Sequence, residues 1–170
     1  VDFYPHDDPT LLNAMIYSYR TNRPKKLLQF WDKYKVVYDP EYCYCDRPAF
    51  LKAWAHYRLD EYDAVRQTLL DAEALPCPYI IDQIKGNYLR SLARQDRMSV
   101  IDSLIPVYLE EESEGQDDLK ARYASILGPV MMELALMGKN EKVKDVVRKH
   151  IPDLEAFDDW FLTRALIGEY

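Results

Sequence analysis

Apolar residues recur at three- and four-residue steps in the first part of the chain. Because an α-helix completes a turn in about 3.6 residues, this spacing places them on one helical face. The pattern breaks at residues 21–24, which read Thr-Asn-Arg-Pro. Proline suits the first turn of a helix and disrupts its interior. The pattern therefore predicts two amphipathic helices joined by a turn, with inner positions at Leu12, Met15, Ile16, Tyr19, Leu27, Leu28, Phe30 and Trp31.

The same plan recurs further along the chain. One apolar face covers residues 50–57, a turn follows at Leu59-Asp60-Glu61, and a second apolar face covers 62–70. This predicts a second helical hairpin, with inner positions at Phe50, Leu51, Trp54, Tyr57, Tyr62, Val65, Leu69 and Leu70.

Two more units align with the second one. Shifts of 38, 36 and about 42 residues carry each unit onto the next and keep apolar residues aligned with apolar residues. The third turn is expected at residues 94–97. The aligned residues include Leu27, Val65, Ile101 and Val143 on the second helices, and Asp96 with Gly138 at the last two turns.

Repeats of about 34 to 42 residues, each built from two helices, are typical of an α-solenoid. We expect an all-α fold and one domain over residues 1–170, with about four hairpins at about 9–38, 46–75, 78–113 and 116–150. A final helix over 153–168 is expected to cap the stack. Most prolines lie at these boundaries, but Pro106 and Pro129 lie inside expected helices and should kink them.

Two stretches resemble known helical repeats. Residues 12–19 are similar to the first helix of a pentatricopeptide repeat, which reads roughly Tyr-Asn-x-Leu-Ile-x-x-Tyr. Phe30 and the closing Asp39-Pro40 suit the second helix of that repeat and its exit. Residues 53–70 also resemble a tetratricopeptide repeat, through Tyr57, Leu59, Tyr62 and Ala64.

The size, repeat type and acidic character together resemble the small pentatricopeptide-like accessory subunits of the euglenozoan (trypanosomatid) mitochondrial F-type ATP synthase. This resemblance implies a non-catalytic subunit, bound to the outside of the catalytic head through the ATP synthase α-subunit. It also implies a soluble protein on the matrix side of the inner membrane. The first residue is Val, as expected either after removal of a presequence or for a shortened sequence.

The charge argues against nucleic acid as the partner. The formal net charge is −7, which repels phosphate at long range. Pentatricopeptide proteins usually read single-stranded RNA through a polar residue on each first helix. The corresponding positions are Asn13, Leu51, Asn87 and Pro129, so only two of the four could bond to a base. An organellar RNA-binding or ribosome-associated factor is the alternative function.

Two sets of residues are candidates for partner contact. Tyrosines off the apolar faces could anchor a protein interface, since aromatic residues are enriched there. The acidic run that begins at residue 110 is either a solvated loop or a surface that docks on a basic patch. The candidate residues are Tyr4, Tyr17, Tyr38, Tyr42, Tyr44, Glu110, Glu111 and Glu112.

No catalytic, cofactor or metal site is expected. His6, His56 and His150 lie in different units, and none has a carboxylate, serine or cysteine partner at a catalytic spacing. The cysteines are Cys43, Cys45 and Cys77, an odd number without zinc-ligand spacing. The chain also lacks a glycine-lysine phosphate loop and any apolar run of the ~20 residues that a membrane helix needs.

Overall fold

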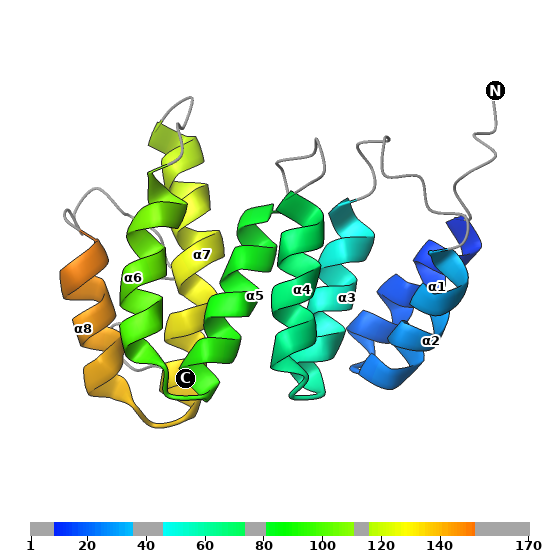
Figure 1. The fold of residues 1–170 in the computed structure, drawn as a ribbon, viewed down its shortest axis with the longest axis horizontal. Coiled ribbons are helices and arrows are strands. Elements are labelled where there is room, and N and C mark those ends of the chain that lie inside the picture. The colour runs from blue at the N-terminus through cyan, green and yellow to red at the C-terminus, as the bar shows by residue number, and fades with distance from the viewer. Residues whose placement is uncertain (1–8, 36–45, 74–80, 111–115, 152–170) are drawn as a thin grey trace. The chain divides into compact units, whose positions relative to one another are not determined.

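The described part of the chain consists of helices joined by short turns. The computed structural model describes residues 9–35, 46–73, 81–110 and 116–151, and these ranges hold eight α-helices and no strand (Figure 1). The all-α prediction is therefore confirmed for this part of the chain. The helices are α1 (Pro9–Arg20), α2 (Pro24–Tyr34), α3 (Asp46–Arg58), α4 (Tyr62–Glu73), α5 (Ile81–Arg94), α6 (Met98–Leu109), α7 (Gln116–Leu136) and α8 (Asn140–His150).

The chain divides into two compact units, residues 1–84 and 85–170. The prediction of one continuous domain stays a prediction. In the first unit α1 packs on α2, α2 on α3, and α3 on α4. Its core contains the inner residues expected for the first hairpin, and the Tyr19 ring meets Trp54 edge-on at 4.7 Å between centroids. The fully buried members of this core are Met15, Leu27, Tyr34, Leu51 and Ala55.

One inner position of the second hairpin was predicted wrongly. Leu70 is 47% exposed, because Val65, Thr68, Leu69 and Ala72 already occupy the buried face of α4. Leu70 lies one step beyond that face and points to solvent.

In the second unit α6, α7 and α8 pack against one another, and α5 packs on α7. Pro106 lies inside α6 and Pro129 inside α7, as expected, and both helices continue through their prolines. Proline has no N–H, so Pro129 cannot donate to the carbonyl of Ser125 one turn earlier. The Cα of Gly86 on α5 approaches that carbonyl closely.

The same turn joins the two helices of every hairpin. One residue of each turn has a left-handed backbone, with φ between 52° and 71°. This residue donates its N–H to the carbonyl three residues earlier, and the next residue donates to the carbonyl five residues earlier. Those two bonds define a Schellman motif, which ends a helix and satisfies its last carbonyls. The left-handed residues are Asn22, Asp60, Asp96 and Gly138.

These four residues are separated by 38, 36 and 42 positions, which are the shifts that the apolar pattern predicts. Five residues after each of them comes a fully buried apolar residue, whose N–H bonds to the last residue of the turn. The repeat therefore includes the turn geometry as well as the apolar pattern. The buried residues are Leu27, Val65, Ile101 and Val143.

The left-handed turn predicts the effect of a mutation at Gly138. Its φ is 71°, and no atom lies within 4 Å of a Cβ added there. Gly138→Ala should therefore lower the free energy of unfolding by about 1 kcal/mol through backbone strain alone. Gly138→Asn should cost less, because Asn tolerates this conformation better. Urea denaturation of both variants measures this, and an unchanged or higher stability for Gly138→Ala would contradict the turn assignment.

Candidate functional site

The outer face of α1 is the best described candidate for partner contact. Thr10, Asn13, Tyr17 and Arg20 are exposed, and their spacing of three, four and three residues places them along one stripe. Tyr17 is 61% exposed and is the largest side chain of the stripe. The helix beneath it is held in place, because its opposite side packs in the core, where Met15 is fully buried. The stripe thus presents an aromatic ring on a fixed helix.

The structure describes two of the eight residues predicted for partner contact. Tyr17 is exposed, as its register predicts. Glu110 is exposed at the C-terminal end of α6, where its N–H donates to the Pro106 carbonyl at 3.0 Å. The two lie in different units. The other six lie outside the described residues: Tyr4, Tyr38, Tyr42, Tyr44, Glu111 and Glu112.

The positions that would read RNA bases differ in accessibility. Asn13 is exposed, but Leu51 is 2% and Asn87 5% exposed, and Pro129 is half-buried. The Nδ2 atom of Asn87 is buried without a hydrogen-bond partner among the described residues. Of the four positions, only Asn13 offers its side chain freely to solvent.

The first hairpin concentrates positive charge. Residues 9–35 contain six Lys and Arg residues and one acidic residue, Asp32, whereas the whole chain carries −7. All six cationic side chains are exposed. Sequence reasoning missed this feature because it used the charge of the whole chain, while a count for each hairpin would have found it. The cations are Arg20, Arg23, Lys25, Lys26, Lys33 and Lys35.

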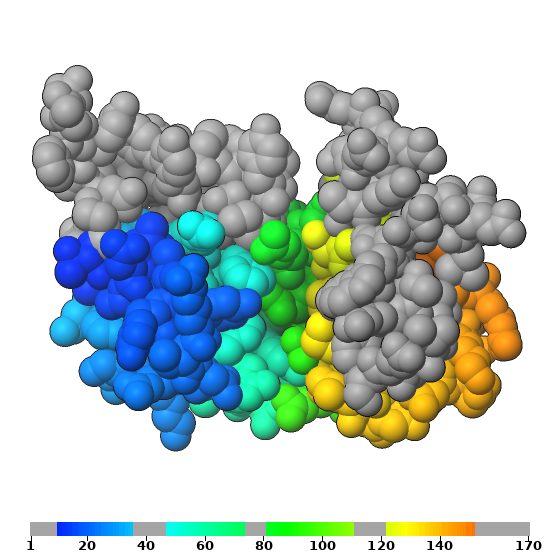
Figure 2. Space-filling model, turned by 180° about the vertical axis from the view of Figure 1, so that it is seen from behind, coloured from blue at the N-terminus to red at the C-terminus, as the bar shows by residue number. Residues whose placement is uncertain are grey.

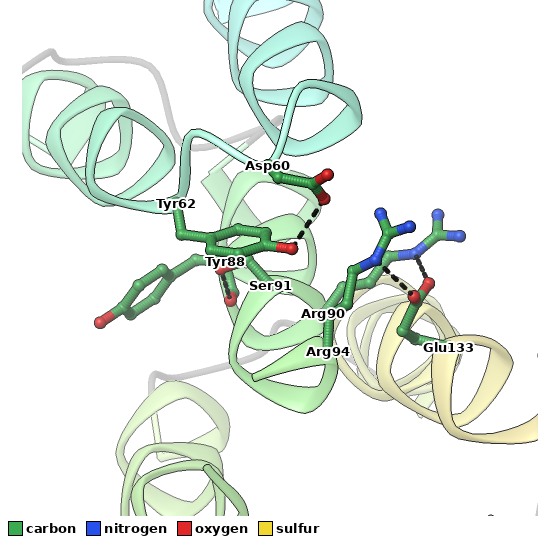
Figure 3. Close-up of polar contacts among 7 residues, drawn as sticks. All are labelled: Asp60, Tyr62, Tyr88, Arg90, Ser91, Arg94 and Glu133. Carbon is green, nitrogen blue, oxygen red and sulfur yellow. Dashed lines mark hydrogen bonds and ion pairs between the residues drawn. The ribbon is translucent and has the colours of Figure 1, made fainter. Parts of the chain in front are cut away.

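A buried ion-pair cluster joins α5 to α7. Glu133 is 6% exposed at its side chain and accepts a hydrogen bond from Arg90 Nε at 2.9 Å, with Arg94 Nε at 3.5 Å from its other oxygen. Figure 3 shows both arginines extending from the same helix towards this carboxylate. Arg90 and Arg94 are one helical turn apart, so they reach Glu133 together. The cluster therefore stabilises the contact between these two helices.

The helices of the last two hairpins are joined by further ion pairs. Asp102 on α6 binds Lys149 at 2.6 Å and His150 at 3.3 Å. Burial raises the pKa of Asp102, but the hydrogen bonds from Lys149 and His150 outweigh it and lower the pKa overall. At the turns, Asp96 binds Lys139 at 2.8 Å and also Lys142. These contacts cross more than 40 residues of sequence and were not predicted.

The ion pairs of Asp96 with Lys139 and Lys142 make the stability of the fold depend on pH. Hydrogen bonds from Lys139 and Lys142 lower the pKa of Asp96 from 3.8 to about 2. The native state then binds fewer protons than the unfolded state between these two values, so stability falls as pH falls through them. Asp96→Asn keeps a residue that tolerates the left-handed turn but removes the charge. It should lower the melting temperature at pH 7 and differ little from the native chain near pH 2. A difference that persists unchanged to pH 2 would contradict this account.

Two histidines have carboxylate partners that the sequence spacing did not indicate. Besides His150, His56 Nδ1 lies 2.7 Å from Glu61 Oε2. The Glu61 N–H also donates to the His56 carbonyl at 3.0 Å, so this pair spans the turn between α3 and α4. Its local role is to hold the turn. Among the described residues, no group of three His, Cys, Asp or Glu side chains is arranged to hold a metal ion, and the three cysteines lie outside them.

Within the described ranges, no helix combines the length and apolar character needed to cross a membrane. Comparison with protein-family models, with curated proteins and with solved structures finds no match for this chain.

Proposed function

We propose that this chain is a non-catalytic protein-binding subunit, and that the outer face of α1 is part of its docking surface. The observation that carries the proposal is the exposed Tyr17, set between Asn13 and Arg20 on a fixed helix. Tyrosine and arginine are enriched among the residues that dominate binding energy at protein interfaces. A rigid ring also loses little conformational entropy when it is buried.

In this proposal the repeated hairpins stack on one another to form an α-solenoid. The identical Schellman turns and the aligned buried residues support it, because a repeated local geometry is what stacked hairpins require. Within the first unit α2 already packs on α3, so one hairpin covers a face of the next. A solenoid offers an extended surface, which suits the binding of a larger protein.

The proposed partner is the α-subunit of a mitochondrial ATP synthase, in the catalytic head. Its support is the sequence resemblance to pentatricopeptide-like accessory subunits of that enzyme. In this role the chain would reside in the mitochondrial matrix and contribute no nucleotide chemistry of its own. The burial of Leu51 and Asn87 favours this role over base-by-base reading of RNA.

Replacing Tyr17 tests the docking surface. Tyr17→Ala should weaken binding to a purified mitochondrial ATP synthase head about 30-fold, since loss of an aromatic anchor costs about 2 kcal/mol. Biolayer interferometry would measure the dissociation constants. The matched control is Val107→Ala, which shortens another exposed side chain in the second unit. Equal affinities for Tyr17→Ala and the native chain would show that α1 does not dock, and absence of binding by the native chain would remove the proposed partner.

A further inference from the structure

We draw no further inference here: the strongest candidate, the exposed apolar patch of Leu136 and Met137 at the turn between α7 and α8 (Figure 2, yellow to orange), carries nothing, because nothing in the described part of the structure shows what covers it.

Discussion

Gly86→Ala is expected to destabilise the second unit by about 3 kcal/mol, at the upper end of the usual cost of overpacking a well-packed core. A Cβ on Gly86 would overlap the backbone carbonyl oxygen of Ser125 and lie 3.0 Å from Pro129 Cγ. The obstacle is backbone in the middle of α7, so a side-chain rotation cannot relieve it. The helices would have to separate, which would also strain the contact between Glu133 and Arg90.

The expected loss of stability is opposite in sign to the effect that helix propensity predicts. Alanine is favoured over glycine in a helix interior by about 1 kcal/mol, so helix propensity alone predicts a stabilised variant. Thermal unfolding should instead show a melting temperature lower by about 15 °C, at 4–8 °C per kcal/mol for a unit of this size. An unchanged or raised melting temperature would contradict the close approach of α5 and α7.

Glu133→Ala is expected to cost about 3 kcal/mol, because removing one partner of a buried ion pair leaves the other charge uncompensated. The remaining charge is chiefly Arg90, whose side chain is only 15% exposed, while Arg94 can reach solvent at 40%. Replacing both partners, as in R90M/E133L, should restore most of the stability, since apolar side chains of similar volume need no partner.

A surface pair provides the control for this prediction. Glu141 binds Lys144 at 2.6 Å but is 78% exposed, so Glu141→Ala should change stability far less than Glu133→Ala does. Urea denaturation of the three variants would measure these differences. If R90M/E133L loses as much free energy of unfolding as Glu133→Ala, the cluster stabilises the fold through something other than charge compensation.

Sequence patterns predicted the helices and turns well because both depend on local residues. The break before Pro24 follows from the chemistry of proline, and the apolar spacing identifies the buried side of each helix. The repeat shifts also succeeded, since Asp96 and Gly138 occupy the same position of the same turn. The prediction that Leu70 is buried was wrong, because Leu69 and Leu70 fit the periodicity equally well. Only packing determines that Leu69 is the buried one.

The polar contacts between helices could not be predicted in this way. Arg90 and Glu133 are separated by 43 residues, as are Asp96 and Lys139. The sequence around one residue of such a pair does not identify the other residue. The approach of Gly86 to α7 also requires the positions of two helices. The concentration of positive charge in residues 9–35 was predictable in principle, because it follows from counting charges in one hairpin.

The proposed role as a protein-binding subunit is tested most directly by recovery of the tagged chain from mitochondria, with quantification of what accompanies it. The account predicts that ATP synthase α- and β-subunits are recovered in a constant ratio to the chain. Recovery with ribosomal proteins or transcripts in their place, or of the chain alone, would contradict it.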